Sequence, residues 1–430
     1  MRLIIIGAGF GGLKLATALS NKPGFDILLI DRVNYHQFQP LFYQVATSGL
    51  DASNISFPLR KVFQKSRNVR IRMAEVKQVD TDQKQVITDI GDFGYDVLVI
   101  ATGAGNNFFG NKNMAEYALP MKSTLEAIAL RNRLLQNFEE ALQAKDEKEM
   151  QKYLNIIVVG GGPTGVELSG AIADMRHYVL PKDYPEIDFS KMKIFLLEGT
   201  SRTLATMSEK SSVQSCTYLK RLGVIVKTGT LLKDYDGETA TFQNGDTIGS
   251  KIVIWAAGIK GNVPAGIDPA LVAKGNRIKT DRYNKIQSFK DIYAIGDVAA
   301  IEGDPAYPNG HPQLAGVAIQ QGVALAKNLL IMEKKKGGLK AFVYNDKGSM
   351  ATVGRNLAVV DIPKPKLHLG GFFAWMIWMT VHLFLILGVK NRFFIFLNWL
   401  YNYFTYDQNL RLIFTGTRSA QTNSEKVRRL

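Results

Sequence analysis

The sequence predicts an α/β fold: two Rossmann-like dinucleotide-binding domains, the second inserted into the first, followed by an amphipathic helical segment at the C-terminus. Three observations support this prediction. Glycine-rich turns at residues 7–12 and 160–165 each follow a short apolar run. The strand, turn and helix pattern around the first turn recurs around the second. Residues 366–430 differ from the rest, because long uncharged stretches rich in aromatic side chains alternate with basic residues.

Composition limits the classes of protein to which the chain can belong. The 430 residues carry a net charge of +15 and are 46% hydrophobic, enough for a buried core in two or more domains. Cys216 is the single cysteine, which excludes an intrachain disulfide, a CxxC redox pair and a cysteine zinc site. No metal site is predicted. Because an apolar strand already begins at Leu3, we expect no signal peptide and a cytoplasmic body.

The order of the predicted elements sets the domain boundaries. Apolar runs predict strands at 3–6, 25–30, 95–100, 154–159, 193–197 and 252–255, and periodic patterns predict helices at 13–19, 164–178 and, as a hairpin, 121–153. Residues 292–297 return the chain to the first domain. We therefore assign 1–115 and 261–345 to the first nucleotide domain, 150–260 to the second, 116–149 to a helical connection and 346–430 to a C-terminal region.

The first glycine-rich turn has the pattern that binds a dinucleotide pyrophosphate. Gly7 allows the tight turn, Gly9 lets the backbone approach the pyrophosphate, and Gly12 lets the helix pack closely on the sheet. Free N–H groups at the start of the helix favour the anion. Asp31, at the end of the next strand, is placed to accept hydrogen bonds from ribose hydroxyls. The residues expected to bind this nucleotide are Gly7, Gly9, Phe10, Gly11, Gly12, Asp31, Arg32 and Val76.

The second turn repeats this pattern with Gly160, Gly162 and Gly165, and Glu198 is its strand-end acid. A carboxylate there accepts from a 2′-hydroxyl and repels a 2′-phosphate, which favours NADH over NADPH. Arg202, four residues later, is an argument against this preference, because an arginine can hold a 2′-phosphate. The other interpretation is that Arg202 is a solvated surface residue. Glu167 either faces the nicotinamide or only places an acid near the positive end of its helix.

Three further motifs give the chain a resemblance to a known superfamily. Ala101-Thr102-Gly103, Ala256-Ala257-Gly258 and the segment 293–298, with Gly296-Asp297, resemble markers of the two-dinucleotide-binding flavoproteins, the pyridine nucleotide–disulfide oxidoreductase-like superfamily. The resemblance implies non-covalent FAD at the first turn, NAD(P)H at the second, and a hydrogen bond that Asp297 accepts from the ribityl chain. It adds to the FAD site Ala101, Thr102, Gly103, Gly296, Asp297 and Ala315, and to the NADH site Pro163, Thr164, Ala257 and Gly258.

The lone cysteine restricts where the electrons can go. Disulfide reductases of this superfamily need a cysteine pair beside the flavin, and sulfide:quinone reductases and NADH peroxidases also need cysteines. Cys216 fits none of these, and we expect it to be a small buried hydrophobe. The acceptor must then lie outside the chain: a quinone, oxygen or a redox protein.

The C-terminal segment favours a membrane quinone. On a helical wheel, one face holds Phe393, Phe396, Leu397, Leu400, Tyr403 and Phe404, and another holds Asn391, Asn398, Asn402 and Thr405. This pattern, flanked by Lys390, Arg392 and Arg411, predicts an interfacial membrane-anchoring helix. A helix docked on the protein body and a dimer interface are the alternatives. Residues 367–389 are long enough to span a membrane, but His382 and the paired glycines 370–371 favour two short helices in one leaflet. Residues 341–362 predict a hairpin with its turn at 346–348.

Taken over residues 1–415, the chain resembles the type II NADH:quinone oxidoreductases, single-subunit respiratory enzymes that do not pump protons. The segments 35–47 and 391–405 support this, as does 315–322, which is similar to the family's quinone-site motif. That motif keeps Gln320 but has Gly316 in place of its first glutamine, and Ala171 replaces a glutamate carried by many members. The candidate catalytic residues are Gln320, Gln321, Glu167 and Lys390, the last of which could equally be a headgroup anchor.

The resemblance implies a peripheral enzyme on the cytoplasmic face of the plasma membrane that passes hydride from NADH to FAD and then reduces menaquinone or ubiquinone. A homodimer remains possible, and nucleic acid is not expected as a partner. Two other functions stay open. A flavoprotein of the same fold could reduce oxygen or a redox protein, and a non-enzymatic flavoprotein could sense NADH through a change in partner binding.

Overall fold

The computed structural model describes residues 1–408 and 410–414. Residue contacts divide the chain into two compact units. The first unit contains Met1–Gln37, Ser56–Asn107 and Gly258–Lys347; the second contains Phe38–Ile55, Phe108–Ala257 and the described residues from Gly348 onward.

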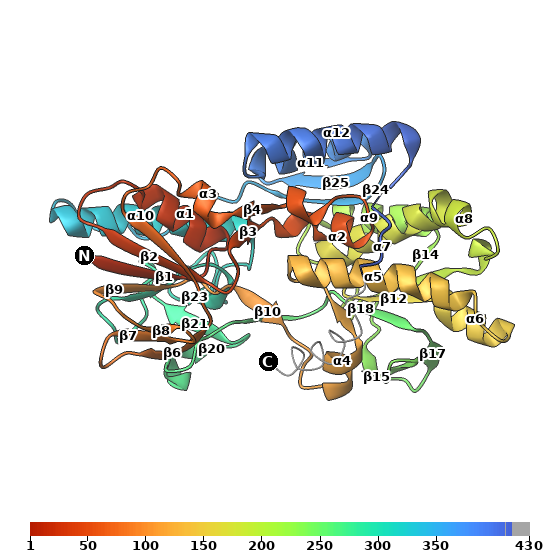
Figure 1. Cartoon of the computed structure of the whole chain (residues 1–430), viewed down its shortest axis with the longest axis horizontal. Coiled ribbons are helices and arrows are strands. Elements are labelled where there is room, and N and C mark those ends of the chain that lie inside the picture. The colour runs from red at the N-terminus through yellow and green to blue at the C-terminus, as the bar shows by residue number, and fades with distance from the viewer. Residues whose placement is uncertain (409, 415–430) are drawn as a thin grey trace. The chain divides into compact units, whose positions relative to one another are not determined.

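The first unit is built on a five-stranded parallel sheet with the order β22-β9-β1-β2-β5. Its strands are β1 (Arg2–Ile6), β2 (Asp26–Asp31), β5 (Val69–Met73), β9 (Val97–Ile100) and β22 (Ile292–Ala294). The central strands are continuous buried apolar runs, as expected for a parallel sheet covered on both faces. The predicted strands at 3–6, 25–30 and 95–100 are thus confirmed within a residue or two. Helix α1 (Phe10–Leu19) and helix α10 (Ala315–Lys334) lie side by side (Figure 1).

Helix α10 is, within the described residues, the one helix long and apolar enough to cross a membrane by length and composition. Its packing explains that composition. A Cβ at Gly322 would stand 2.6 Å from the carbonyl oxygen of Gly11, so the backbones of α10 and α1 approach closely. The buried residues of α10 form one broad face: Val317, Ala318, Gln321, Gly322, Leu325, Ala326, Asn328 and Leu329.

Smaller elements complete the first unit. The bounds are β3 (Tyr35–Gln37), β4 (Ser56–Pro58), α3 (Leu59–Val62), β6 (Val76–Asp80), β7 (Gln85–Thr88), β8 (Gly91–Gly94), β10 (Ala104–Asn106), β19 (Ile259–Gly261), β20 (Val272–Ala273), β21 (Arg277–Thr280), the 3₁₀ turn η5 (Gly296–Val298) and β23 (Ala299–Ile301).

The second unit repeats the plan with a sheet of order β11-β18-β12-β13-β14, again parallel. Its strands are β11 (Leu119–Pro120), β12 (Asn155–Val159), β13 (Lys193–Leu197), β14 (Val224–Lys227) and β18 (Ile252–Trp255). Helix α7 (Pro163–Tyr178) follows the second glycine turn, and the predicted hairpin is α5 (Thr124–Ala141) and α6 (Glu147–Leu154). The other helices are α2 (Phe42–Ala46), α4 (Lys112–Tyr117), α8 (Leu180–Asp183) and α9 (Glu209–Arg221).

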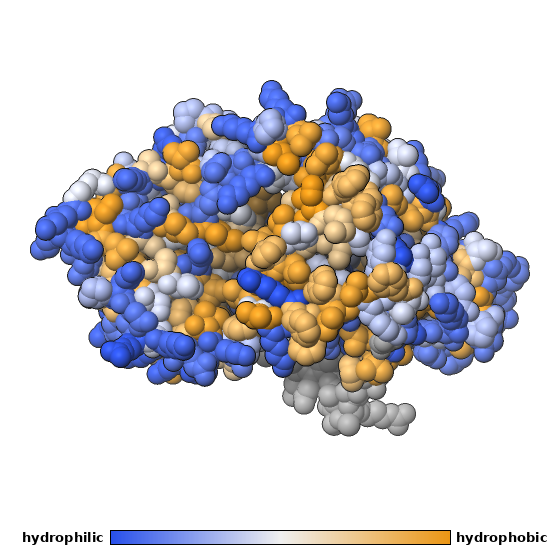
Figure 2. All heavy atoms as spheres, turned by 90° about the horizontal axis from the view of Figure 1, so that it is seen from above, coloured by the Kyte–Doolittle hydropathy of each residue, from blue (hydrophilic) through white to orange (hydrophobic). Residues whose placement is uncertain are grey.

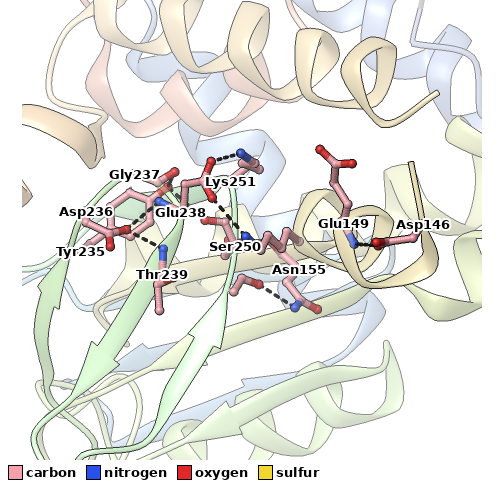
Figure 3. A network of polar contacts seen from close by, with 12 residues as sticks. Asp146, Glu149, Asn155, Tyr235, Asp236, Gly237, Glu238, Thr239, Ser250 and Lys251 are labelled. Atoms are coloured by element: carbon pink, nitrogen blue, oxygen red, sulfur yellow. Dashed lines mark hydrogen bonds and ion pairs between the residues drawn. The ribbon is translucent and has the colours of Figure 1, made fainter. Parts of the chain in front are cut away.

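A polar network joins the antiparallel β15 (Leu232–Tyr235), β16 (Thr239–Phe242) and β17 (Thr247–Gly249) to the parallel sheet (Figure 3). Glu238 pairs with both Lys152 and Lys251. The Ser250 hydroxyl donates to the carbonyl oxygen of Asn155 at 2.6 Å. Asn155 Nδ2 in turn donates to the Gly249 carbonyl at 2.8 Å. These contacts fix the start of β12, the strand that leads into the second glycine turn.

The C-terminal region begins with an antiparallel sheet of β24 (Ser349–Gly354), β25 (Leu357–Ile362) and β26 (Leu367–Gly370). The predicted hairpin is present, but its predicted turn at 346–348 is wrong. Gly354 pairs with Leu357, so the turn is Arg355-Asn356, and Asn356 adopts a left-handed φ of 63°. Asparagine tolerates that conformation, so a turn forms there without glycine.

Two helices follow, α11 (Phe372–Leu385) and α12 (Val389–Thr405). The continuous span once considered for 367–389 is ruled out, because its first residues form β26 and α11 has 14 residues. A helix of that length is about 21 Å long, short of the roughly 30 Å of a bilayer core. Gly388, at a φ of +83°, then separates α11 from α12. The preferred prediction of two short helices is confirmed.

Candidate functional site

The first glycine turn has the backbone geometry of a pyrophosphate site. Gly7 has a φ of +102°, and a Cβ there would stand 2.3 Å from the Ala101 carbonyl oxygen. A Cβ at Gly12 would stand 1.9 Å from the carbonyl oxygen of Gly7. Gly9 is the N-cap of α1, makes no side-chain cap, and has nothing within 4 Å of its would-be Cβ. The first N–H groups of α1 lack partners within the helix, so this end of the helix is suited to an anion.

Asp31 braces this turn. Its Oδ2 accepts from the Ala8 N–H at 2.6 Å, and its Oδ1 accepts from the Val33 N–H at 3.0 Å. Burial raises the pKa of Asp31, and these two hydrogen bonds oppose the rise. Because each carboxylate oxygen has a second lone pair, Asp31 can hold the turn and still accept from a ribose hydroxyl.

The second turn has the same hydrogen bonds and backbone conformation as the first. Glu198 Oε2 accepts from the Gly161 N–H at 2.6 Å, and Oε1 accepts from the Thr200 N–H at 2.7 Å. Gly160 has a φ of +111°, and a Cβ at Gly165 would stand 1.9 Å from the carbonyl oxygen of Gly160. A Cβ at Gly161 would lie 2.9 Å from Glu198, so the longer acid requires glycine where the shorter Asp31 leaves room for Ala8.

Arg202 is occupied within its own loop. Its Nη2 donates to the carbonyl oxygens of Ala205 at 2.9 Å and Met207 at 3.3 Å. These backbone acceptors hold the guanidinium, and Glu198 stays the residue at the end of β13 that is predicted to favour NADH over NADPH.

We expect Glu198→Gln to weaken the preference for NADH. Removing the carboxylate removes both a charge-assisted acceptor and the repulsion of a 2′-phosphate, worth roughly 1.5–3 kcal/mol. The ratio of kcat/KM for NADH to that for NADPH should fall at least about tenfold. Steady-state kinetics with both nucleotides measure it, with the exposed Glu209→Gln as the matched control. An unchanged ratio would show that another group sets the preference.

The remaining residues predicted for the first nucleotide are grouped in the first unit. Phe10 begins α1, with its ring edge-on to His36 at 5.2 Å. Thr102 Oγ1 donates to the Asn262 carbonyl at 2.6 Å, which joins the 101–103 turn to the segment that follows β19. The others lie beside these elements: Gly11 in α1, Arg32 after β2, Val76 at the start of β6, Gly103 at a φ of +67°, Asp297 in η5 and Ala315 at the start of α10.

The two glutamines of the quinone-motif remnant make structural contacts in the same unit. Gln321 is buried, and its Oε1 accepts from the N–H of Gly296 at 2.6 Å. Gln320 Nε2 donates to the Asn345 carbonyl, and its Oε1 accepts from the Asn345 N–H, both at 2.9 Å. Gln321 therefore fixes the Gly296 turn beside Asp297, and Gln320 ties α10 to the segment after it.

Of the residues predicted for NADH, Pro163 and Thr164 are exposed in the first turn of α7. Ala257 follows β18, and its backbone nitrogen would stand 2.9 Å from a Cβ at Gly160, just before α7. Gly258 begins the segment that returns the chain to the first unit, and it has the same φ of +67° as Gly103.

A pocket of about 160 Å³ lies within the second unit. One wall is a stripe of α7: Glu167, Ala171, Asp174 and Tyr178. The others come from α2, from the β24–β25 turn and from α11 and α12, including Trp375, Trp378 and Trp399. The pocket brings together the two family-like segments, 35–47 and 391–405, that the sequence presents far apart.

A chain of hydrogen bonds fixes one side of this pocket. Trp399 Nε1 donates to Gln44 Oε1 at 2.7 Å, and Gln44 Nε2 donates to the Tyr43 hydroxyl oxygen at 2.8 Å. The Tyr43 oxygen therefore acts as an acceptor toward Gln44, and its own proton is available to donate. Burial, with the charges of Glu167 and Asp174, raises the pKa of Tyr43 well above its usual value, so the phenol stays neutral.

Glu167 lies in the second turn of α7 and is buried, so it is not a solvated acid at the helix end. Burial raises its pKa to about 8, opposed by the Thr352 N–H, which donates to Oε1 at 3.4 Å, and by the Trp378 side chain. At neutral pH the group is mostly protonated and can donate. Lys390 is not in this pocket; it is exposed at the start of α12, with Nζ 5.6 Å from the centre of the Phe394 ring.

Two charged pocket residues escaped the sequence analysis. The Arg355 N–H donates to Asp174 Oδ2 at 3.3 Å, and the Arg355 guanidinium stacks on Tyr403 and Tyr406 at 4.2 and 3.8 Å. Burial raises the pKa of Asp174 to about 6, against the lowering effects of the Arg355 N–H and charge. The periodic spacing of 167, 171, 174 and 178 on one helix was the available signal.

Cys216 lies on α9 and is half-buried, so the expectation of a buried cysteine is wrong. Cys216 follows Ser215, which belongs to the buried face of α9, and so lies at the edge of that face. Within the described residues, no group of three or more His, Cys, Asp or Glu side chains is placed to hold a metal ion.

We expect Glu167→Gln to stabilise the protein increasingly as pH rises. The folded-state pKa of about 8 exceeds the ordinary value of 4.5, so the unfolded chain releases its proton first and wild-type stability falls between these pH values. The neutral amide avoids this loss. The Tm difference between variant and wild type should grow from pH 5 to pH 8 and then level off. The exposed Glu186→Gln serves as the control; a difference independent of pH would contradict a buried neutral acid.

Two family models match the chain, one over its two nucleotide domains and one over its C-terminal region. Residues 1–322 match the family model of pyridine nucleotide-disulphide oxidoreductases, and residues 347–406 match the NDH2 C-terminal domain. The chain is 34% identical over 447 residues to a type II NADH:quinone oxidoreductase of Mycobacterium tuberculosis, covering 100% of this chain and 94% of that protein. It is 28% identical to a type II NADH:quinone oxidoreductase of Haemophilus influenzae, covering 88% and 92%. The solved structure of NDH2 from Plasmodium falciparum in complex with NADH superposes with a TM-score of 0.85 at 22% identity, covering 96% of this chain and 99% of that one.

Proposed function

This chain belongs to the type II NADH:quinone oxidoreductases, and we propose that the quinone head group is reduced in the pocket of the second unit. The enzyme oxidises NADH and reduces a quinone with FAD as its flavin. The observation that carries the proposal is that the buried acid Glu167, the Tyr43 side chain and three tryptophans line one pocket.

The two glycine turns divide the nucleotides between them. We assign FAD to 1–115 and 261–345 and NADH to 150–260. Bound FAD supplies the two-electron chemistry that links hydride oxidation to quinone reduction. The chain holds and orients: the N-terminus of α1 binds a pyrophosphate, Asp31 accepts from a ribose, Asp297 accepts from the ribityl chain, and Glu198 accepts from the NADH ribose.

The pocket suits a quinone for two physical reasons. Trp375, Trp378 and Trp399 line it, and aromatic side chains pack well against a planar ring. Tyr43 and Glu167 are neutral donors at neutral pH, and a quinone oxygen gains negative charge as it is reduced. Donors fixed in a buried site stabilise such charge more than water does. Gln320 and Gln321 are expected at the quinone from the sequence. In this proposal, Gln321 positions the Gly296 turn and Gln320 positions residue 345.

The enzyme is membrane-associated, and the C-terminal helices are proposed as its contact. Their apolar side chains point outward: Phe373, Phe384, Val389, Phe393 and Phe404 are between 56% and 81% exposed. Figure 2 shows apolar side chains gathered over this part of the molecule. The polar face of α12 packs inward, where Asn402 Nδ2 donates to the Gly49 carbonyl at 3.3 Å. An exposed face of this size and aromatic content is typical of insertion into one leaflet.

The basic residues near these helices differ in role. Arg392 donates to the carbonyl oxygens of Ile386 and Phe384 at 2.8 and 2.9 Å, so it caps the end of α11. Lys390 remains the lysine placed to reach a lipid headgroup. We propose attachment to the cytoplasmic face of the plasma membrane by α11 and α12. A homodimer through this face, and the choice between menaquinone and ubiquinone, are decided by the experiments below.

We expect the triple change Phe373→Ser, Phe393→Ser, Phe404→Ser to release the protein from membranes. Each phenylalanine removed from the leaflet costs roughly 1.5–3 kcal/mol of binding. Flotation with anionic vesicles should show a loss of at least about a hundredfold in partitioning. The exposed Leu125→Ser is the control. If the variant still floats but its sedimentation shifts from dimer to monomer, the face is a dimer interface.

Tryptophan fluorescence tests the proposed quinone site. Three of the four tryptophans line the pocket, so a short-chain menaquinone or ubiquinone analogue should quench most of the emission saturably. Trp399→Phe should reduce the quenchable fraction, whereas Trp255→Phe, outside the pocket, should raise it. The quinone that saturates at the lower concentration is the better substrate candidate. Quenching that is linear in quinone concentration would place the quinone elsewhere.

A further inference from the structure

The pocket wall formed by α7 carries two carboxyl groups, Glu167 and Asp174. Glu167, Ala171, Asp174 and Tyr178 are spaced by four, three and four residues, so they form one stripe along the helix. All four line the pocket. Exposure rises along the stripe, from 8% at Glu167 to 42% at Tyr178, with Asp174 partly buried between them. The stripe therefore leads from the interior to solvent.

The spacing of the two acids suits one ring. Seven residues of α-helix separate Glu167 from Asp174, an axial distance of about 10.5 Å. Ala171, between them, contributes only a methyl group, which leaves space over the helix. The two oxygens of a p-quinone point in opposite directions across a six-membered ring. A quinone lying along α7 can thus accept one hydrogen bond of about 2.7 Å at each end.

The surroundings of Asp174 let it exchange a proton. The Arg355 N–H donates to one carboxyl oxygen, and the Arg355 charge, held between Tyr403 and Tyr406, lies over the same end of the pocket. The other titratable groups that face it are Tyr43 on α2, with Glu167 and Tyr178 on its own helix. Burial holds the pKa of Asp174 at about 6, close enough to neutrality for both protonation states to be populated.

We propose that Asp174 is a second catalytic carboxyl group, which protonates one carbonyl oxygen of the quinone while Glu167 protonates the other. The proposal rests on the quinone site of the preceding section. Reduction to the quinol takes two electrons and two protons; NADH oxidation releases two electrons and one proton. Each carboxyl group gives one proton and becomes a carboxylate. One is reprotonated by the proton from NADH and the other from water, a net uptake of one proton per NADH.

The experiment compares Asp174→Asn with Asp174→Glu, and with Asp246→Asn as an exposed control. Anaerobic stopped-flow measures flavin reduction by NADH and, separately, reoxidation by a short-chain quinone from pH 5 to pH 9. We expect Asp174→Asn to slow the quinone half-reaction about a hundredfold, within the range of general acid catalysis. Flavin reduction should stay unchanged, the pH step near 6 should vanish, and Asp174→Glu should recover part of the rate. Flavin content and quinone quenching of tryptophan fluorescence confirm that the fold and the pocket survive.

Ala171→Leu, which fills the space between the acids, separates the two hypotheses. If it blocks quinone reduction while Asp174→Asn does not, the site stands and the role of Asp174 is overturned. If neither variant slows quinone reduction, the quinone site itself is wrong. If Asp174→Asn slows the reaction but the pH step near 6 remains, Asp174 is a structural residue and the proposal fails.

Discussion

Gly12→Ala is expected to abolish FAD binding. The added Cβ would stand 1.9 Å from the carbonyl oxygen of Gly7, and a backbone atom cannot rotate away as a side chain can. Either the turn opens or α1 shifts along the sheet, and both outcomes move the N–H groups that face the pyrophosphate. The purified protein should be colourless, with less than about a tenth of the wild-type flavin. Absorbance at the flavin band and flavin release on denaturation measure this directly.

Two other glycines make the test specific. Gly338→Ala adds a methyl group where nothing lies within 4 Å, so flavin content should be unchanged. Gly9→Ala is also free of clashes within the protein, yet Gly9 is the N-cap where the pyrophosphate is expected to approach. It should fold normally and lose affinity for FAD. Full flavin retention in Gly12→Ala would mean that the first turn does not bind the dinucleotide.

Gly170→Ala is expected to separate the C-terminal sheet from α7. A Cβ at Gly170 would stand 1.5 Å from the carbonyl oxygen of Val353, so β24 must move away from the helix. Overpacking of this kind costs roughly 1–3 kcal/mol. Because Thr352 and Arg355 belong to the displaced segment, the contacts to Glu167 and Asp174 should be lost with it.

The expected phenotype is selective. NADH oxidation with ferricyanide should persist, because the glycine turns are untouched, whereas quinone reduction and Tm should both fall. Gly338→Ala is the matched control, since its added methyl group has nothing within 4 Å and lies outside the pocket lining. Wild-type quinone activity in Gly170→Ala would show that the packing of β24 on α7 has no bearing on the site.

The parallel sheets and glycine turns could be predicted from the sequence because their causes are local. Four or five apolar residues in succession make a strand buried on both faces, and the next glycine must adopt a positive φ, as Gly7 and Gly160 do. Asp31 could be found from its spacing to the first glycine turn, and Glu198 from its place at the end of the predicted strand 193–197. The structure adds that both acids accept from a backbone N–H of the glycine turn, Asp31 from Ala8 and Glu198 from Gly161. The residue beside the longer acid has to be glycine.

The pocket could be predicted only in part, because its residues come from segments that are distant in sequence. Trp399 meets Gln44 across 355 positions, and Asp174 meets Arg355 across 181. No local pattern links such partners. The hairpin turn was misplaced for a related reason: Asp346-Lys347-Gly348 is the stronger turn signal, but the strand pairing selects Arg355-Asn356. The helical wheel of α12 did predict opposite faces, and the structure shows that Trp399 and Ile395 lie on the inward side.

The most direct test of the account is an anaerobic double-mixing experiment on wild type and Ala171→Leu. NADH first reduces the flavin, and a short-chain quinone or oxygenated buffer is then added. The account predicts equal rates of flavin reduction in both proteins, with fast reoxidation by quinone and slow reoxidation by oxygen in wild type. In Ala171→Leu the quinone reaction should be slowed and the oxygen reaction unchanged. Equal quinone reoxidation in the two proteins would contradict the claim that electrons reach the quinone in this pocket.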